Sequence, residues 1–304
     1  MDHPTHTQHR EVILAAPGNE ELATLLAEEG HDLVKVELRQ FPDGESYIRI
    51  HGDLKDRDVT IVCTLHRPDR VFLQLALLAH TARDLGAKTL CLVAPYLSYM
   101  RQDERFHAGE AVTSSYLAMM FSQWFDELIT VDPHLHRWKS LDEIYAIPTY
   151  HVSAAPSITR WVSQEVKQPL IVGPDSESEQ WASALASALG VPYVVLEKVR
   201  QGDRDVQVSG EILTDREAYQ PVLVDDIIST GRTMVEAIHL LKEQGFESPI
   251  CIAIHAVFSD DAEQHILQAG GQCLVTCNTI EHTTNRINVW QEVVSCWKER
   301  PARC

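Results

Sequence analysis

The sequence of 304 residues predicts an α/β protein with two domains, each a mainly parallel sheet flanked by helices. Short apolar runs rich in β-branched residues alternate along the chain with longer segments whose apolar residues have helical spacing. Such alternation is typical of parallel sheets covered on both faces. It occurs in two successive series, and the length suits one large domain or two ordinary ones.

The first series supplies the elements of an N-terminal domain, residues 1–150. Its expected strands are Val12–Ala15, Val59–Cys63, Thr89–Ala94 and Leu128–Val131. Its expected helices are Val71–Leu85 and Val112–Phe125.

The second series supplies a C-terminal domain, residues 151–285. Its expected strands are Leu170–Val172, Tyr193–Leu196, Val222–Val224, Ile250–Ala256 and Cys273–Thr276. Its expected helices are Glu179–Leu189, Thr233–Glu243 and Ala262–Gln268. We expect the hinge at Pro148–Pro156, and we expect the last segment, 286–304 with its helical pattern Val289–Lys298, to pack back on the first domain.

Composition narrows the class of function. The content of 44% hydrophobic and 23% charged residues is that of a soluble globular protein. The net charge of -18 disfavours binding to nucleic acid, which needs clustered cations, but local cations and Mg²⁺ still permit an anionic small molecule. The seven cysteines lack CxxC spacing, and several lie in apolar runs, so we expect reduced thiols. No apolar run is long enough to span a bilayer, and the polar first ten residues lack a signal-peptide core, so a cytoplasmic enzyme is expected.

The most informative segment is residues 222–233, which read VLVDDIISTGRT. An apolar strand ends in two acids, Asp225 and Asp226, and a short turn with hydroxyls and Gly231 then opens a helix. Backbone N–H groups of such a turn, with the helix N-terminus behind them, bind phosphate, and the glycine lets the backbone approach it. The acids are placed to accept hydrogen bonds from the hydroxyls of a sugar phosphate.

Four other segments place polar residues in turns or after expected strands, where ligands of open α/β sheets bind. They read FPDGE at 41–45, PYLSYMRQDERF at 95–106, TVDPH at 130–134 and VGPD at 172–175. A fifth, LEKVR at 196–200, puts Lys198 and Arg200 on the same side of an extended segment, where they can bracket one phosphoryl group.

In their order along the chain, these segments resemble the ribose-phosphate pyrophosphokinase family, from about Val12 to Thr279. Residues 222–233 resemble the phosphoribosyl pyrophosphate signature, which the type I phosphoribosyltransferases share. The other segments resemble the pyrophosphokinases specifically. The resemblance implies two phosphoribosyltransferase-like domains, Mg²⁺ as cofactor and a homo-oligomer. It implies transfer of the β,γ-diphosphoryl group of ATP to the 1-hydroxyl of ribose 5-phosphate, giving phosphoribosyl pyrophosphate and AMP.

The resemblance also implies a role for each motif residue. The implied catalytic cations are Lys198 and Arg200. The implied ATP-binding residues are Phe41, Asp43, Glu45, Arg101, Gln102, Asp103 and His134. The implied ribose 5-phosphate-binding residues are Asp225, Asp226, Ser229, Thr230, Gly231, Arg232 and Thr233. The implied metal-site residues are His134 and Asp175.

The chain departs from the family pattern at three places. Arg232 stands where many relatives have a second glycine, and Pro133 replaces a leucine or isoleucine. The loop Ser176–Glu179 is more acidic than is common, which bears on the detail of the ribose-phosphate pocket.

Two alternative functions remain open from the residues. A phosphoribosyltransferase would share residues 222–233 but would not account for the Arg101–Asp103 segment or the paired domains. A non-catalytic regulatory relative would share the fold, although it is expected to lose the metal residues or the Lys198–Arg200 pair, which are present here. A P-loop kinase is disfavoured because no GxxxxGK[ST] segment occurs.

Overall fold

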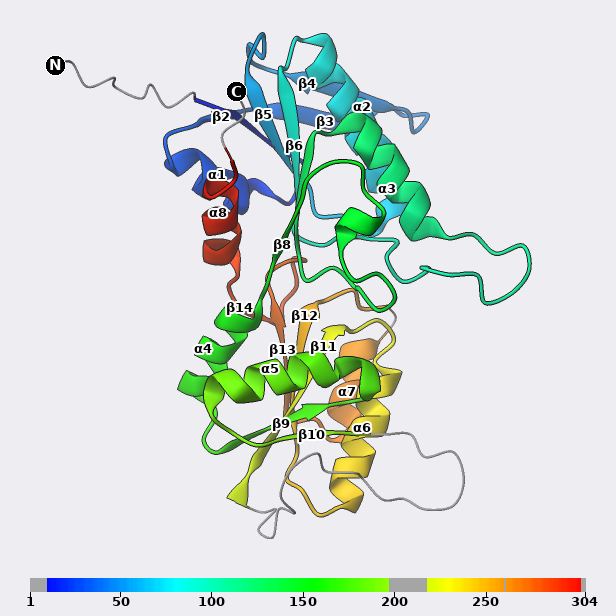
Figure 1. Cartoon of the computed structure of the whole chain (residues 1–304), viewed down its shortest axis with the longest axis vertical. Coiled ribbons are helices and arrows are strands. Elements are labelled where there is room, and N and C mark those ends of the chain that lie inside the picture. Colours follow the sequence, from blue (N-terminus) through cyan, green and yellow to red (C-terminus); the bar gives the residue numbers. More distant parts are fainter. Residues whose placement is uncertain (1–9, 197–217, 260, 302–304) are drawn as a thin grey trace, which may run out of the picture. The chain divides into compact units, whose positions relative to one another are not determined.

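The computed structural model describes residues 10–196, 218–259 and 261–301. The chain divides into two compact units, unit 1 (Met1–Val152 with Val293–Cys304) and unit 2 (Ser153–Glu292). The boundary at Val152 falls inside the stretch 148–156, which is more than a connection because it contains a strand and the first turn of a helix. Each unit is an α/β layer structure (Figure 1).

Unit 1 is built on a six-stranded sheet of order β2-β1-β5-β6-β7-β8, in which every neighbouring pair is parallel. Its strands are β1 (Val12–Ala15), β2 (Asp32–Val34), β5 (Asp58–Val62), β6 (Thr89–Ala94), β7 (Glu127–Val131) and β8 (Thr149–Val152). Its helical segments are α1 (Glu20–Glu28), α2 (Pro68–Asp84), α3 (Thr113–Trp124) and the short η1 (Leu141–Glu143). A separate antiparallel hairpin joins β3 (Val36–Gln40) to β4 (Ser46–Ile50).

The core of unit 1 lies between this sheet and helices α2 and α3. Leu14, Ile61 and Leu92 on the central strands are fully buried with Phe121 of α3. The Phe121 ring lies 5.8 Å from that of Phe125 and 6.0 Å from that of Phe72 on α2. Fully burying side chains of this size stabilises a fold by roughly 1.5–3 kcal/mol each, so this cluster fixes both helices on the sheet.

The C-terminal residues of unit 1 are held by a buried polar network. Helix α8 (Trp290–Lys298) carries Trp297, whose Nε1 donates to Thr60 Oγ1 at 3.1 Å. Beyond it, Arg300 donates to Glu127 Oε2 at 2.9 Å and to Glu11 Oε1 at 3.0 Å. Glu11 precedes β1 and Glu127 begins β7, so the network lies at the amino edge of the sheet.

Unit 2 repeats the arrangement with a parallel sheet of order β10-β9-β11-β12-β13-β14. Its strands are β9 (Pro169–Gly173), β10 (Tyr193–Val195), β11 (Gln220–Ile227), β12 (Ile250–His255), β13 (Cys273–Cys277) and β14 (Asn285–Ile287). Its helical segments are α4 (Ala155–Glu165), η2 (Ser176–Ser178), α5 (Glu179–Leu189), α6 (Arg232–Glu243) and α7 (Ala262–Ala269). Leu223 of β11, Ile238 of α6 and Ile266 of α7 are buried in its core.

The predicted fold class is confirmed, since both sheets are parallel and carry helices between their strands. Helices α1 and α4, the hairpin and the short edge strands β2, β8 and β14 were not predicted from the sequence. Most residues of the hairpin and of β2 are partly or fully exposed, so their sequences carry a weaker apolar signal than the buried strands do.

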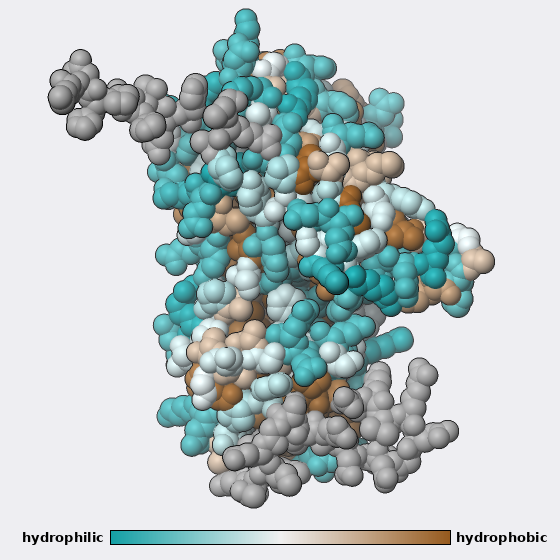
Figure 2. All heavy atoms as spheres, in the orientation of Figure 1, coloured by the Kyte–Doolittle hydropathy of each residue, from teal (hydrophilic) through white to brown (hydrophobic). Residues whose placement is uncertain are grey.

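The face of the molecule drawn in Figure 2 is mostly hydrophilic, with apolar side chains in small separate groups. Among the described residues, no helix combines the length and the apolar character that a membrane span requires.

Candidate functional site

In unit 2, three carboxylates gather at the carboxyl edge of the sheet. Strands β9 and β11 are parallel neighbours, with Val172 beside Leu223. Asp175 follows β9, and the adjacent Asp225 and Asp226 lie near the carboxyl end of β11, so topology alone brings all three to one edge. This edge is where open α/β sheets bind ligands.

Two of these carboxylates hold local backbone structure. Asp175 Oδ1 accepts hydrogen bonds from the N–H groups of Glu177 and Ser178, at 3.1 and 3.2 Å, and so caps η2. Asp225 Oδ1 accepts from the N–H of Asp226 at 3.0 Å. A carboxylate has about four acceptor positions, so these bonds leave each group able to bind a ligand.

The three carboxylates at this edge of the sheet carry like charges that repel one another. Burial, together with the negative charges of Asp226 and Asp175, raises the pKa of Asp225 well above its ordinary value. A bound cation, or a sugar hydroxyl that donates to the carboxylate, would relieve this repulsion.

The turn after β11 leads into the N-terminus of a helix, an arrangement that can bind phosphate. It runs from Ile228 to Gly231, and α6 begins at the next residue, so the first N–H groups of the helix face the turn. Ser259 braces it: its N–H donates to Ser229 O at 3.0 Å, and the two hydroxyl oxygens lie 3.4 Å apart. Thr230 is exposed and Thr233 is half-buried, so hydroxyls are present on the turn and in the first turn of the helix.

Both the backbone conformation at position 231 and the close packing of α7 favour a glycine there. The φ of Gly231, 75°, lies in the left-handed region, which favours glycine. A Cβ at this position would lie 3.2 Å from Ile266 Cδ1 and 3.3 Å from the carbonyl oxygen of Ala262, both on α7. Arg232, the next residue, is exposed, so its side chain lies on the outside of the helix start.

In unit 1, Phe41, Asp43 and Glu45 form the turn of the β3–β4 hairpin. The Phe41 N–H donates to Glu45 O at 2.8 Å, and the Glu45 N–H donates to Asp43 Oδ1 at 3.1 Å. Phe41 is 41% exposed, with its ring 5.9 Å from that of Tyr47 and 4.9 Å from the guanidinium carbon of Arg39. The turn therefore presents an aromatic face and a cation on the surface, both suited to contact with a base.

The segment after β6 carries Arg101, Gln102 and Asp103, and the three residues differ in their surroundings. Arg101 is exposed and Gln102 half-buried. Asp103 is buried, and its Oδ1 accepts from Arg137 Nη1 at 2.9 Å. Arg101 and Gln102 are available to a ligand, whereas the carboxylate of Asp103 is committed to a partner within the chain.

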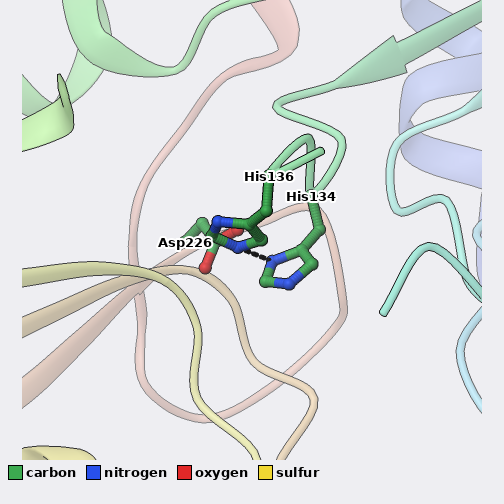
Figure 3. A group of neighbouring side chains, drawn as sticks. All are labelled: His134, His136 and Asp226. Atoms are coloured by element: carbon green, nitrogen blue, oxygen red, sulfur yellow. Dashed lines mark hydrogen bonds between the residues drawn. The ribbon is translucent and has the colours of Figure 1, made fainter. Parts of the chain in front are cut away.

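His134 lies in the loop after β7, close to a second histidine that the sequence analysis did not single out. Nδ1 of His134 and Nε2 of His136 are 3.0 Å apart, and the two rings are edge-on (Figure 3). The spacing of two residues between histidines in a ligand loop was a signal that could have found His136. Asp132, which starts this loop, is fully buried and bonds His151 of β8 at 2.9 Å.

Lys198 and Arg200, the predicted catalytic cations, lie outside the described residues. The predicted residues that the structure does describe fall into two groups. In unit 1 they are the hairpin turn and the loops after β6 and β7. In unit 2 they are the acid after β9, the acids near the end of β11 and the turn before α6. Arg137 and Ser259 are contributors that local sequence patterns did not reveal, because each acts through residues distant in sequence.

The donor set of unit 2 fits a divalent cation that prefers oxygen ligands. The negative charge of Asp175 contributes to the raised pKa of Asp225, and carboxylate oxygens are the ligands that Mg²⁺ uses in proteins. The His134–His136 pair offers ring nitrogens, which Mg²⁺ binds less readily than oxygen.

Comparison with known proteins agrees with this arrangement. Residues 12–124 match the model of the N-terminal domain of ribose phosphate pyrophosphokinase, and residues 140–292 match that of the phosphoribosyl transferase domain. The chain is 31% identical to the ribose-phosphate pyrophosphokinase of Methanobrevibacter smithii, with 95% of this chain and 100% of the relative covered. It is 35% identical to that of Saccharolobus solfataricus, with 82% and 85% covered.

The fold of a phosphoribosylpyrophosphate synthetase from Mycobacterium smegmatis is also similar, with a TM-score of 0.81 at 22% identity over 94% of this chain and 97% of that one. Sequence similarity across both domains and the fold therefore lead to the same assignment, which confirms the resemblance seen in the sequence. The chain belongs to the ribose-phosphate pyrophosphokinase family.

Proposed function

We propose that this protein transfers the β,γ-diphosphoryl group of ATP to the 1-hydroxyl of ribose 5-phosphate, releasing AMP. One observation carries the proposal beyond family membership. Asp175 follows β9 and Asp225 lies near the carboxyl end of the neighbouring β11, beside a turn before α6 that can bind phosphate. A site for a sugar phosphate needs both a turn that binds the phosphate and carboxylates that accept hydrogen bonds from the sugar hydroxyls.

The ribose phosphate belongs to unit 2 in this proposal. The turn residues hold the 5-phosphate through backbone N–H groups and hydroxyls. The acids at the end of β11 accept hydrogen bonds from the ribose hydroxyls. The residues assigned to this substrate are Asp225, Asp226, Ser229, Thr230, Gly231, Arg232 and Thr233.

The nucleotide belongs to the motifs of unit 1. Arg101 and Gln102 donate to ATP, and the exposed Phe41 ring, in the turn that Asp43 and Glu45 close, stacks on a base. His134 is assigned a place beside the phosphates of the nucleotide. The proposal includes a homo-oligomer, because the hairpin turn is exposed on its own unit and can also serve the nucleotide of a second copy.

Mg²⁺ is the cofactor we propose, with Asp175 as its principal ligand and Asp225 near it. When bound, the ion neutralises charge on the transferred phosphates. The chain's own work is to position the two substrates in line and to stabilise charge, since diphosphoryl transfer needs little covalent chemistry from the protein. Lys198 and Arg200 are the cations proposed for the β-phosphoryl group.

An assay of AMP formation tests the proposal. Purified protein with Mg²⁺-ATP should release AMP only when ribose 5-phosphate is present, without any nucleobase. Omission of Mg²⁺ with added chelator should abolish release. A requirement for a base together with phosphoribosyl pyrophosphate would identify a phosphoribosyltransferase instead, and binding of both substrates without AMP release would identify a non-catalytic relative.

A further inference from the structure

The loop of residues 101–112, which carries Arg101 and Gln102, has little apolar anchoring of its own. Nearly all of its first ten residues are exposed or half-buried, and Asp103 is the one that is buried. An exposed loop without a hydrophobic anchor takes its position from specific polar contacts. Within the loop, Glu110 accepts from the N–H groups of Phe106 and His107, and the contacts of its first part with a neighbouring loop come from Arg137.

Arg137 contacts three residues of the loop. Its Nη1 donates to Asp103 Oδ1 at 2.9 Å, and its Nη2 forms an ion pair with Glu104 Oε1, also at 2.9 Å. Its guanidinium carbon also lies 5.1 Å from the centre of the Phe106 ring. The Asp103 side chain is only 2% exposed, so this pair is shielded from solvent on the carboxylate side. A planar fork that reaches two carboxylates and a ring is geometry that arginine provides and lysine does not.

The neighbour of Arg137 fixes the other end of the same loop. Trp138 Nε1 donates to Ser114 Oγ at 3.4 Å, and Ser114 is fully buried at the start of α3. The Ser114 N–H in turn donates to Gln102 O at 3.3 Å. The dipeptide Arg137–Trp138 therefore holds the loop at Asp103–Phe106 and, through Ser114, at the carbonyl group of Gln102.

Arg137 is itself part of the loop that carries the histidines. It follows His136 directly and lies three residues after His134, whose ring contacts that of His136. A shift of the Arg137 backbone would move the histidine pair, and a shift of Asp103 would move Arg101 and Gln102. The two loops of the nucleotide side are thus joined by a side chain that none of the sequence motifs contains.

We infer that Arg137 is a positioning residue that couples the Arg101–Gln102 loop to the His134 loop and so sets the affinity for the nucleotide. This inference rests on the proposed function, because that function gives both loops to ATP. Arg137 acts through Asp103, so the carboxylate of Asp103 is a part of the clamp and not a direct contact of the nucleotide.

Steady-state kinetics of Arg137→Gln tests the inference. The KM for ATP should rise roughly tenfold to a hundredfold, the scale on which a displacement of about 1 Å acts. The KM for ribose 5-phosphate should stay within about twofold, because that substrate is assigned to other residues. Arg137→Lys keeps the charge and loses the fork, so it should fall between wild type and Arg137→Gln. Equal rises in both KM values would overturn the inference and indicate general loss of structure.

A double-mutant cycle separates the clamp from direct nucleotide binding by Asp103. Asp103→Asn alone should raise the KM for ATP, but added to Arg137→Gln it should cause little further change, since both variants break the same contact. Effects that multiply would mean that Asp103 contacts the nucleotide independently, which would overturn the assigned role.

Arg83→Gln is the matched control. Arg83 also forms an ion pair in unit 1, with Asp126 Oδ2 at 2.6 Å, but Asp126 precedes β7 and so lies at the opposite edge of the sheet. This variant should lower thermal stability without changing the KM for ATP. A comparable rise in that KM for Arg83→Gln would show that any lost ion pair has the effect, and would refute a specific role for Arg137.

Calorimetric titration with a non-hydrolysable ATP analogue distinguishes this inference from the proposed function. Analogue binding that is tenfold or more weaker in Arg137→Gln, with wild type releasing no AMP, would support the clamp and reject the reaction. Unchanged analogue binding in Arg137→Gln, with normal AMP release by wild type, would reject the clamp and leave the reaction standing.

Discussion

Replacement of Gly231 by alanine is the most informative single perturbation of the phosphate turn. Gly231 has φ 75° at the start of α6, and a Cβ there would lie 3.2 Å from Ile266 Cδ1 and 3.3 Å from Ala262 O. Two separate costs follow, one from the left-handed backbone and one from the contact with α7. Both act at the turn that we assign to the 5-phosphate.

The magnitudes follow from these two terms. A left-handed backbone costs a residue with a Cβ about 1–2 kcal/mol. An added methyl in a packed site typically costs about 1–3 kcal/mol, and here one of the two contacts is a backbone oxygen that cannot rotate away. The sum for Gly231→Ala is about 2–5 kcal/mol.

Gly245 provides a matched control at the other end of α6. Its φ is 80°, so its backbone strain as alanine is similar, but no atom lies within 4 Å of the added Cβ. Gly245→Ala should therefore lose only about 1–2 kcal/mol. Differential scanning calorimetry measures both variants, with roughly 2–4 °C of Tm per kcal/mol for a domain of this size.

The KM for ribose 5-phosphate should separate the two variants more clearly than Tm does. Gly231→Ala should raise the KM for ribose 5-phosphate at least about tenfold because the turn must move away from α7. Gly245→Ala should leave that KM unchanged. Equal losses of stability and equal KM values in the two variants would refute both the steric contact with α7 and the role of Gly231 in binding the 5-phosphate.

Three further predictions concern other parts of the chain. Because the pKa of Asp225 is raised, the folded protein keeps a proton on this carboxyl that the unfolded chain releases above a pKa of about 3.9. In the presence of chelator, Tm should therefore fall as the pH rises from about 3.9 through the pKa of the folded state. Asp225→Asn should raise Tm at pH 7 in chelator, flatten this pH dependence and abolish AMP release; a lower Tm would contradict it. Arg300→Met leaves Glu11 and Glu127 without their shared cation and should cost about 3–5 kcal/mol, measured as a lower Tm of unit 1, with unchanged Tm as the refuting result. Lys198→Ala should lower turnover at least about a hundredfold with little change in the KM for ribose 5-phosphate, and near-normal turnover would remove its proposed role.

The central strands could be predicted because their sequences are determined by burial on both faces. Val12–Ala15 and Thr89–Ala94 are strands with the predicted bounds, and their residues are almost all buried. The β3–β4 hairpin was missed because its apolar residues alternate with charged ones such as Glu37, Arg39 and Arg49, unlike the continuous apolar runs of the buried strands. An exposed two-stranded hairpin is specified by its turn and cross-strand pairs more than by burial.

The candidate site shows the same division between local and distant information. The order of acids, hydroxyls and Gly231 in one segment predicted an anion-binding turn, since every group needed is contiguous in sequence. The contact of Gly231 with Ile266 and the clamp of Arg137 on Asp103 join residues more than thirty positions apart. No local pattern encodes such pairs, so the second reason for the glycine and the role of Arg137 emerged only from the fold.

The fate of labelled phosphate tests the central claim most directly. Protein is incubated with ribose 5-phosphate and Mg²⁺, in parallel with ATP labelled at the β-phosphorus and with ATP labelled at the γ-phosphorus. The proposed reaction predicts that both labels enter one sugar product in equal molar amounts, matched by the AMP released. Transfer of the γ label alone, with ADP as the second product, would contradict diphosphoryl transfer and identify an ordinary sugar kinase.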